Sequence, residues 1–577
     1  MSKVIGDALP SAEVGFSAPG GERNDPRRFR WPSQAPHIAL ALILLAGVVV
    51  LWVLSRGLTF YQDTWAFLMH RQEFTAAAFL EPHNEHIVVI PVAIEKALIA
   101  LFGMGSATPE YVVLIVMLTT TAALIYIYIE RRLGAWPAVM ATSVVVFLGP
   151  AWTVLLWPFQ IGFVGAMMSG LGMLLMLDCK DRRGDRIACA LLAVSLAFSS
   201  LGLSFACAAA VDIALQRSTR GLQRIYVLLA PISLFAIWYL GWGHDAESHL
   251  SLHNVLVSPI YLLKGLAASC ESILGLNTLP VEGGGKPEWG WPILVALTLF
   301  AVFWKIRRPS FHERLWPAAA ALLSFWLLAA FNYIPGREAV ANRYAYTGVL
   351  LLLIVLADFF RDLRISRMAL AIAALVTVAV VTSNLVRLNE GRDFLKEQTI
   401  LTRADLAAFD IAQDTVSPEF FLAPEIAGTP SLIDVNAAEY LPAMRAHGSP
   451  AYSDAELSSA SPVARRQADL VLASALPITI VPAPEGLEGA QESTCRAIRP
   501  GGSGEVALTS ETTLIEANPG PTAEVALRRF ATGEFPIPTE GVPGDSAIKV
   551  TIPRDRSSKI WHLDVEASQR VRVCRGE

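Results

Sequence analysis

The sequence predicts an all-α polytopic membrane domain of about 11 transmembrane helices, followed by a small α/β-rich extracytoplasmic domain that ends in a β-sandwich. Composition supports the membrane part, because 53% of the 577 residues are hydrophobic and 17% are charged, too apolar for a soluble chain of this length. The mean hydropathy is +0.46 although the last third is ordinarily polar. The apolar residues are therefore concentrated in the first two thirds.

The first 37 residues are polar and rich in proline and glycine, and we expect a disordered cytoplasmic tail there. The apolar run Ile38–Leu54 follows too far from the start, without an A-x-A site, to be a cleaved signal peptide. It is typical of a signal anchor and opens the transmembrane domain, expected over residues 38–386.

Ten apolar runs are candidates for membrane crossings. The fifth run has 29 residues and the polar sequence Ser199–Ser204 at its middle, so we interpret it as two short helices and count eleven crossings. The runs are Ile38–Leu54, Tyr111–Ile129, Trp136–Leu148, Ile161–Leu177, Ile187–Leu215, Ile225–Trp242, Trp291–Trp304, Leu315–Phe331, Tyr344–Phe360 and Met368–Leu385.

The loops between these runs differ in basic residues. One side collects twenty Lys and Arg and the other side seven, provided that the fifth run is a hairpin. Because short cytoplasmic loops are enriched in Lys and Arg, the N-terminus is predicted to be cytoplasmic and everything after Leu385 extracytoplasmic.

The stretch His86–Gly103 has the length of a crossing but carries Glu95 and Lys96 at its centre, which is costly in lipid. We therefore place it in the outer interface as an amphipathic helix, which makes Gly57–Pro109 one long external loop. A second external loop, Gly243–Gly290, is predicted to contain an amphipathic helix near residues 261–274.

The polar third is divided into a helical linker or subdomain over 387–476 and a β-sandwich over 477–577. Cys495 and Cys574 lie in the latter, where a disulfide is compatible with an outward-facing domain. The predicted elements are the helices Asn389–Gln413 and Pro462–Leu476, and short strands such as Ala547–Ile552 and Ile560–Val565.

The chain contains no Walker A loop, nucleophile elbow, zinc-protease motif or dinucleotide fingerprint, and its charge pattern disfavours nucleic-acid binding. What remains is a polar cluster in the first external loop. Asp63 follows the first crossing, and His83, Glu85 and His86 precede the interfacial helix. Carboxylates and imidazoles thus meet at a membrane–water boundary.

A carboxylate such as Asp63 can accept the proton of a sugar hydroxyl that attacks an activated donor. A departing lipid phosphate needs positive charge, which Arg343 at the outer end of a crossing is placed to supply, with Arg337 as a second candidate.

Four features together resemble the GT-C superfamily of integral membrane glycosyltransferases. These are the acid after the first crossing, the interfacial helix closed by Leu101-Phe102-Gly103, a crossing that ends in Glu130-Arg131-Arg132, and the pair Arg343-Tyr344 that opens a late crossing. The resemblance covers roughly residues 38–386. The segment Trp157–Phe163 resembles uncharacterised bacterial multi-pass proteins.

The resemblance implies an enzyme of the bacterial plasma membrane that moves a sugar from a polyprenyl-phosphate lipid to an envelope glycan, lipid or protein. By position, Asp63 matches the catalytic carboxylate of the family. Many members have paired acids here, whereas Asp63 has Gln62 and Thr64 as neighbours, so a divalent metal stays open as a cofactor. The residues assigned to donor or acceptor binding are His83, Glu85, His86, Gln160, Arg337, Arg343 and Tyr344.

Each assignment has an alternative. Asp63 could be a helix N-cap, the His83–His86 cluster could be solvated loop, and Arg343 could be an interfacial anchor. For the whole chain, the alternatives are a transporter or flippase of envelope lipids or glycans, which would need polar midplane helices, and a non-catalytic envelope anchor protein.

Overall fold

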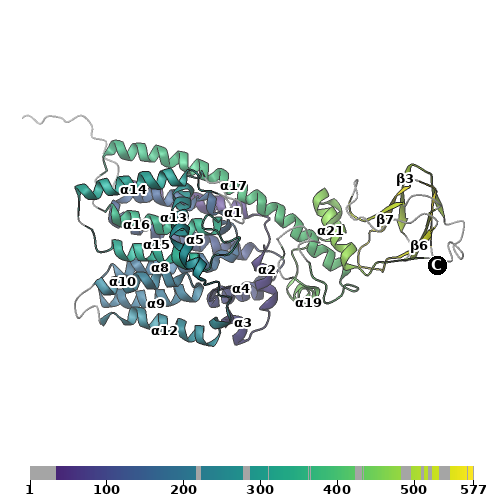
Figure 1. Ribbon diagram of the computed structural model, residues 1–577, viewed down its shortest axis with the longest axis horizontal. Coiled ribbons are helices and arrows are strands. Elements are labelled where there is room, and N and C mark those ends of the chain that lie inside the picture. Colours follow the sequence, from purple (N-terminus) through teal and green to yellow (C-terminus); the bar gives the residue numbers. More distant parts are fainter. Residues whose placement is uncertain are drawn as a thin grey trace, which may run out of the picture.

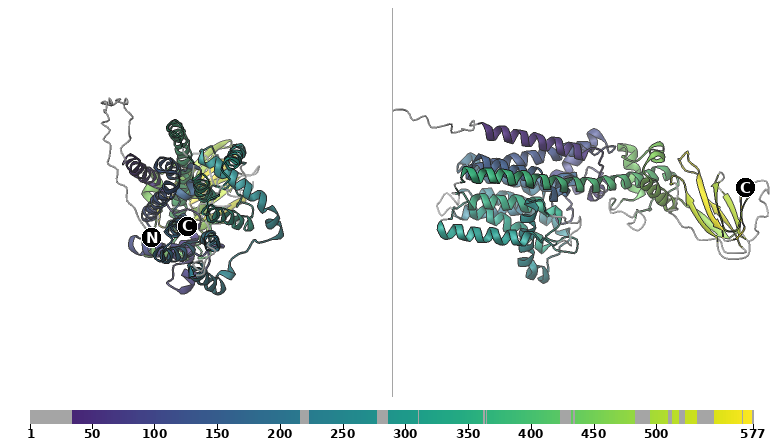
Figure 2. Two further views of the ribbon diagram at one scale, coloured as in Figure 1. Left: turned by 90° about the vertical axis from the view of Figure 1, so that its left-hand side faces the viewer. Right: turned by 90° about the horizontal axis from the view of Figure 1, so that it is seen from above.

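A bundle of helices and two β-sheets lie at opposite ends of an elongated molecule (Figure 1, Figure 2). This computed structural model describes residues 34–575 except 216–222, 277–285, 310, 362, 364, 423–431, 433–434, 483–494, 509–511, 518–522, 532–545 and 568. Of the tail predicted over residues 1–37, residues 1–33 lie outside the described residues.

The bundle and the segments beside it consist of helices because a backbone in lipid must satisfy its own hydrogen bonds. They are α1 (Ala35–Ser55), α2 (Asp63–His70), α3 (Ala76–Leu80), α4 (Val89–Phe102), α5 (Thr108–Leu133), α6 (Ala135–Val146), η1 (Gly149–Ala151), α7 (Trp152–Leu155), η2 (Pro158–Gln160), α8 (Ile161–Leu177), α9 (Arg182–Phe198), α10 (Gly202–Leu215), α12 (Tyr226–Gly241), η3 (Gly243–Asp245), α13 (Leu252–Ile273), α14 (Gly290–Arg307), α15 (Leu315–Phe331), α16 (Asn342–Phe359) and α17 (Arg367–Ala412).

Six of the described helices are long and apolar enough to cross a membrane, and a seventh span results if the bent pair formed by α6 and η1–α7 is taken as one. The protein is therefore a multi-pass membrane protein. The predicted eleven crossings are not confirmed. Helices α9, α10, α12 and α15 contain 14 to 17 residues, fewer than the roughly 20 that a perpendicular crossing needs.

The predicted break in the fifth run is confirmed, since α9 ends at Phe198 and α10 begins at Gly202. A Cβ atom on Gly202 would lie 2.6 Å from the backbone nitrogen of Leu196, so only glycine allows the two helices to approach this closely. The crossing predicted over Trp136–Leu148 is shorter than expected. It ends at Val146 and bends by 45° into η1 and α7, because the ring of Pro150 cannot continue a helix.

The crossing predicted over Met368–Leu385 lies in a helix that is long and apolar enough to span a membrane, but the prediction of a separate helix over Asn389–Gln413 was wrong. Both belong to α17, a single helix of 46 residues and about 69 Å. No proline interrupts it, and Gly391 lies against the ring of Trp152, where a side chain would collide. Helix α17 therefore leaves the bundle without a bend and carries the chain to the C-terminal region (Figure 1).

Helix α4 corresponds to the predicted interfacial helix. Its 14 residues are too few for a crossing, and it lies at the same end of the bundle as α2 and α3 (Figure 1). The ammonium group of Lys96 donates hydrogen bonds to the backbone carbonyls of Arg71 and Glu73. The charge that argued against a crossing thus ties α4 to the loop after α2.

The predicted second external loop is more ordered than expected. It contains α13, a helix of 22 residues that begins at Leu252 instead of near Tyr261 and packs against α14, α15 and α16. Ser251 caps its N-terminus by accepting a hydrogen bond from the backbone N–H of Asn254.

Helices and then strands follow α17, as predicted. The five-stranded sheet has the order β1-β6-β4-β8-β2 and the three-stranded sheet the order β3-β7-β5, and the described strands of both sheets pair antiparallel. A disulfide joins Cys495 to Cys574. The elements are α19 (Ala437–His447), α20 (Asp454–Ser459), α21 (Pro462–Ala475), β1 (Thr479–Pro482), β2 (Arg496–Ile498), β3 (Gly502–Leu508), β4 (Thr512–Ala517), β5 (Glu524–Arg528), β6 (Ser546–Thr551), β7 (Trp561–Ala567) and β8 (Val571–Arg575).

An ionic network joins the helices at the end of the bundle opposite to α2 and α4. The guanidinium of Arg132 pairs with Asp358 at 2.6 Å and with Asp178 at 3.1 Å, and Arg314 connects Asp178 to Asp212. These side chains come from α5, α10, α16 and the ends of α8 and α15. The network therefore fixes how five segments of the bundle meet.

Replacing Arg132 by methionine should lower the free energy of unfolding by about 3–5 kcal/mol, because the fully buried carboxylate of Asp358 loses its guanidinium partner. Denaturant or thermal unfolding of the purified protein measures the change. The control is Arg392→Met, whose partly exposed pair with Asp393 should contribute less than about 1 kcal/mol. Equal stability of R132M and wild type would contradict a structural role for the network.

Candidate functional site

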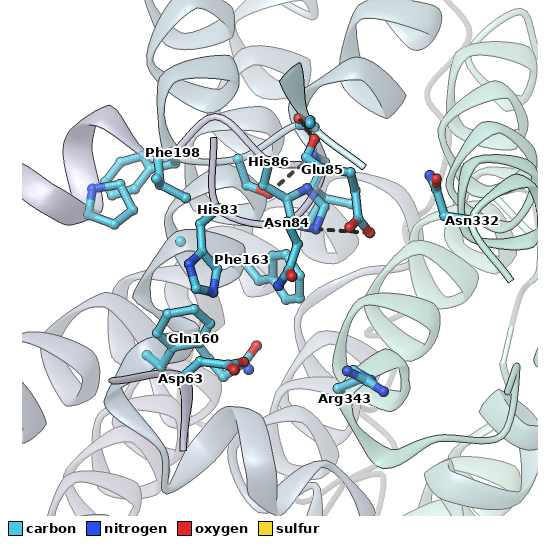
Figure 3. A pocket seen from close by; sticks show the side chains of 18 of the residues that line it. Asp63, His83, Asn84, Glu85, His86, Gln160, Phe163, Phe198, Asn332 and Arg343 are labelled. Carbon is cyan, nitrogen blue, oxygen red and sulfur yellow. Dashed lines mark hydrogen bonds and ion pairs between the residues drawn. The ribbon is translucent and has the colours of Figure 1, made fainter. Parts of the chain in front are cut away.

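A cavity of about 340 Å³ lies at the end of the bundle that carries α2, α3 and α4. Segments far apart in the chain form its walls: the start of α2, the loop before α4, the η2–α8 junction, the α9–α10 break, α12, α15 and the start of α16. All of the predicted site residues line it, namely Asp63, His83, Glu85, His86, Gln160, Arg337, Arg343 and Tyr344. Figure 3 shows six of them by name.

Asp63 is the first residue of α2, one position after the N-cap position that was the alternative considered for it. Gln62 occupies the cap position with φ of 44°, a left-handed conformation that non-glycine residues rarely adopt. Strain of this kind is common next to functional residues. Asp63 lies in the first turn of α2, at the positive end of the helix dipole.

The turn before α2 is held by Trp157. Its indole N–H lies 3.0 Å from the carbonyl oxygen of Tyr61 and 3.1 Å from the hydroxyl oxygen of Thr64. The ring of Tyr61 meets the indole edge to face at 5.3 Å between centroids. A buried tryptophan thus sets the position of Asp63 from both sides.

The His83–His86 loop is a tight turn, in which the backbones of His83 and His86 exchange two hydrogen bonds of 3.0 Å around Asn84 at φ of 50°. The hydroxyl group of Ser200, in the α9–α10 break, donates to the carbonyl oxygen of Glu85 at 3.1 Å. The interruption of the fifth apolar run therefore supplies a support for this loop.

Arg71 holds the segment that precedes the loop. Its guanidinium donates to the carbonyl oxygens of Ala78, Glu81 and Pro82 at 2.7 to 3.0 Å, and burial lowers its pKa. The indole N–H of Trp238 donates to the carbonyl oxygen of Leu80 at 2.7 Å. Neither residue was singled out from the sequence, because an arginine or tryptophan that binds loop carbonyls has no local pattern.

Glu85 lies between a cation and an imidazole. Both carboxylate oxygens accept hydrogen bonds from Arg337, at 2.8 and 2.9 Å, and Nε2 of His86 is 3.7 Å away. Burial acts to raise the pKa of Glu85, but the charges of His86 and Arg337 outweigh it and the net pKa is lowered. Glu85 is therefore a carboxylate at neutral pH, and Arg337 is engaged in neutralising it.

His83 has the opposite character. Its ring lies between Phe67 and Phe159, at centroid distances of 5.6 and 5.1 Å, and burial together with the positive charge of Arg71 lowers its pKa to about 4. The imidazole is thus neutral under physiological conditions. Burial also lowers the pKa of His86.

Arg343 approaches the cavity from the start of α16. One of its guanidinium nitrogens donates to the carbonyl oxygen of Gly336. In Figure 3 its side chain lies on one side of the cavity, and Asp63, His83 and Gln160 lie on the other. Tyr344 follows it, with its ring 6.2 Å from the rings of Phe325 and Trp326.

The divalent metal left open by the sequence does not fit the residues that the structure describes. No group of three His, Cys, Asp or Glu side chains there has metal-binding geometry. The carboxylate nearest to the two loop histidines, Glu85, is bound through both oxygens to Arg337.

No family model matches the chain, and no protein of curated function matches it. Among solved structures it is similar to ArnT from Cupriavidus metallidurans bound to undecaprenyl phosphate, with a TM-score of 0.45 and 13% identity over 72% of this chain and 86% of that chain. The apo state of that protein gives a TM-score of 0.42 with 14% sequence identity. The arabinosyltransferase EmbB from Mycobacterium smegmatis gives a TM-score of 0.32 with 12% sequence identity, over 95% of this chain and 66% of that chain. Similarity at this level assigns no role to any residue of this chain.

The pKa of His83 predicts a pH dependence of stability. In the unfolded chain the imidazole titrates near 6.5, whereas in the folded protein its pKa is about 4. Between these values the unfolded state binds a proton that the folded state does not, so the free energy of unfolding should fall as the pH decreases from about 6.5 to about 4.

The variant His83→Phe, which keeps the ring contacts, should reduce this loss of stability by roughly 1–3 kcal/mol in unfolding experiments at pH 7 and pH 4.5. His244→Phe, at an exposed position, is the matched control and should leave the pH dependence as in wild type. An unchanged slope in H83F would mean that His83 is not held neutral.

Proposed function

We propose that this protein is an integral membrane glycosyltransferase of the GT-C type, which transfers a sugar from a polyprenyl-phosphate lipid to an acceptor of the bacterial cell envelope. The observation that carries the proposal is the arrangement of a carboxylate, Asp63, and a guanidinium, Arg343, on opposite sides of one cavity at the end of an apolar helical bundle. The cell envelope and the outer face of the plasma membrane are part of the proposal and follow from the predicted sidedness.

Asp63 acts as the general base. As an acceptor hydroxyl oxygen forms a bond to the anomeric carbon, its proton passes to the Asp63 carboxylate, and the bond between the anomeric carbon and the phosphate oxygen breaks with its electron pair on the phosphate. Asp63 lies in the first turn of α2, where the positive end of the helix dipole suits a carboxylate.

Arg343 stabilises the phosphate that departs, because a guanidinium forms charge-assisted hydrogen bonds to phosphate oxygens. Two guanidinium groups line the described cavity, and that of Arg337 is bound to Glu85. Arg337 is therefore assigned to holding the Glu85 loop in place, and the phosphate to Arg343.

The apolar part of the donor is accommodated by α12 and α15. Phe235 and Tyr239 of α12 and Phe325 and Leu328 of α15 line the cavity together with the polar residues. Helix α12 packs mainly against α9, and α15 mainly against α10 and α13, so the two helices form separate walls. An amphiphilic cavity of this kind suits a lipid that carries a phosphate and a sugar.

A flippase is the second candidate, because an amphiphilic cavity would also suit a lipid that crosses the membrane. A flippase would move polyprenyl phosphate between leaflets without forming a glycosidic bond. A transfer assay with polyprenyl-phosphate sugars, run beside a leaflet-accessibility assay in vesicles, separates the two functions.

Replacing Asp63 by asparagine should lower the rate of sugar transfer by about 10²–10⁴-fold, because the amide cannot accept the proton. Binding of polyprenyl phosphate should be unaffected. The matched control is Asp245→Asn, at an exposed position beside the cavity. Wild-type turnover in D63N would exclude Asp63 as the base.

Replacing Arg343 by glutamine should weaken the binding of polyprenyl phosphate by roughly 10–100-fold, because the phosphate loses its charge-assisted hydrogen bonds to the guanidinium. Titration of the lipid phosphate into the protein in nanodiscs measures this directly. The control is Arg307→Gln, at the C-terminal end of α14. Unchanged affinity in R343Q would move the phosphate site elsewhere.

A further inference from the structure

Helix α14 lies at the surface of the helical bundle and is in close contact with the bundle mainly where it begins. Its first residue, Gly290, is buried, and a Cβ atom there would collide with the carbonyl oxygen of Ala267 in α13. The residues of α14 after Gly290, all of which the structure describes, are partly or fully exposed. Much of this apolar helix is therefore available to a molecule in the membrane.

A groove of about 570 Å³ separates the second half of α14 from α16. Both helices are long and apolar enough to cross a membrane, so the groove opens toward lipid. Its lining includes Leu297, Ala301 and Lys305 of α14, Leu356 and Phe359 of α16, and Phe311 of the loop that follows α14. Apart from the lysine, these side chains are apolar.

The length of the groove corresponds to one leaflet of a bilayer. Its lining runs along α14 from Leu297 to Ile306, which is about 14 Å at the helical rise of 1.5 Å per residue. The hydrocarbon core of a bilayer is about 30 Å thick, so each leaflet contributes about 15 Å. An acyl chain of one leaflet therefore matches the groove in length as well as in polarity.

A cation lies at the end of the groove where α14 terminates. The ammonium group of Lys305 is 4.5 Å from the ring centroids of Phe311 and Phe359, which hold it by cation–π contacts. A guanidinium nitrogen of Arg361, two residues after Phe359, lies 3.1 Å from Nε2 of His312. Positive charge is therefore collected where the head group of a lipid in the groove would lie.

The two arginines at the end of α14 point in different directions. At 3.6 residues per turn, Arg308 is about 60° from Lys305 around the helix, and Arg307 is about 160° from it. The guanidinium of Arg308 lies 4.9 Å from the ring centroid of Trp304, and that of Arg307 lies 4.2 Å from that of Phe303. Arg308 is thus on the groove side of the helix and Arg307 on the opposite side.

The acidic residues near this end do not cancel the charge. Asp358 of α16 is fully buried and bound to Arg132 at 2.6 Å. Glu313 is exposed in the loop before α15. This end of the groove therefore carries a net positive charge in the described residues, which is complementary to an anionic head group.

We propose that the groove between α14 and α16 binds a phospholipid with an anionic head group. One acyl chain lies along the apolar walls, and the phosphate of the head group contacts Lys305 and Arg308. The site is separate from the cavity, because Arg343 and Phe359 lie at opposite ends of α16, about 24 Å apart. It is also independent of the proposed glycosyl transfer.

A transmembrane helix, from a second copy of this chain or from another protein, fits the groove less well. Helices that associate in a membrane contact one another over much of its thickness and through small residues. The groove extends over about half of that thickness, and its walls present Leu297, Leu356 and Phe359. A lipid is therefore the occupant to which the dimensions and the charge correspond.

The test uses the full-length protein in a mild detergent and native mass spectrometry, which resolves bound lipids by mass. Phosphatidylglycerol and phosphatidylcholine with identical acyl chains are titrated separately. Each cation beside an anionic head group contributes about fivefold in affinity, so the first phosphatidylglycerol should bind about 20-fold more tightly than the first phosphatidylcholine. Lys305→Gln and Arg308→Gln should each weaken phosphatidylglycerol about fivefold and leave phosphatidylcholine unchanged.

Three further variants make the result specific. Arg307→Gln removes the same charge from the opposite side of α14 and should leave both affinities as in wild type. Arg343→Gln, in the cavity, should do the same. Ala301→Trp fills the groove and should weaken both lipids. Unchanged thermal unfolding shows that each variant is folded, and if K305Q is not, Arg308→Gln decides.

Several results would overturn the proposal. Equal affinity for the two lipids would exclude recognition of the head group. An equal loss in R307Q and K305Q would mean that phosphatidylglycerol follows the overall charge of the surface, and a loss in R343Q would place it in the cavity. A dimer of the wild type that A301W abolishes would assign the groove to a helix of a second copy.

Discussion

The position of the candidate site depends on one side chain, the indole of Trp157. Its N–H binds the backbone of Tyr61 and the hydroxyl of Thr64, on both sides of Asp63. Gln160 follows Trp157 by three residues, in the short η2 helix that opens α8. The same hydrogen bonds that orient the carboxylate therefore also set its position relative to the amide, so two side chains almost a hundred residues apart form one wall.

The two ends of the helical bundle use charge differently. At the end that carries the predicted cytoplasmic loops, Asp178, Asp212 and Asp358 each have a guanidinium partner within 3.1 Å, and the network is structural. At the other end, Glu85 is similarly neutralised by Arg337, but Gln160 retains a buried atom without a partner in the described structure. A polar group that the protein leaves unsatisfied is a candidate for ligand binding, whereas a satisfied network stabilises the fold.

The C-terminal region is attached to the site by more than a linker. Helix α17 continues from the bundle without interruption, and α19 packs against α2. The ring of Tyr440 meets that of Trp65 edge to face at 6.5 Å, and the backbone N–H of Met104 donates to the carbonyl oxygen of His447 at 2.7 Å. The helix that carries Asp63 is thus supported by Trp157 of the helical bundle and by Tyr440 of the C-terminal region.

The sequence alone determined which residues are apolar enough to form a membrane bundle, where the fifth run breaks, and which polar residues collect beside the first crossing, since these follow from composition and local pattern. It also indicated Asp63, His83, Glu85, His86 and Arg343 as residues of one site, because loops on the same side of a membrane are confined to one surface. Only the tertiary structure decided that α17 is one helix, that Arg337 serves Glu85, and that Ser200 and Trp157 hold the site loops. Each of these depends on contacts between residues far apart in the chain, and such contacts leave no periodicity or spacing in the sequence.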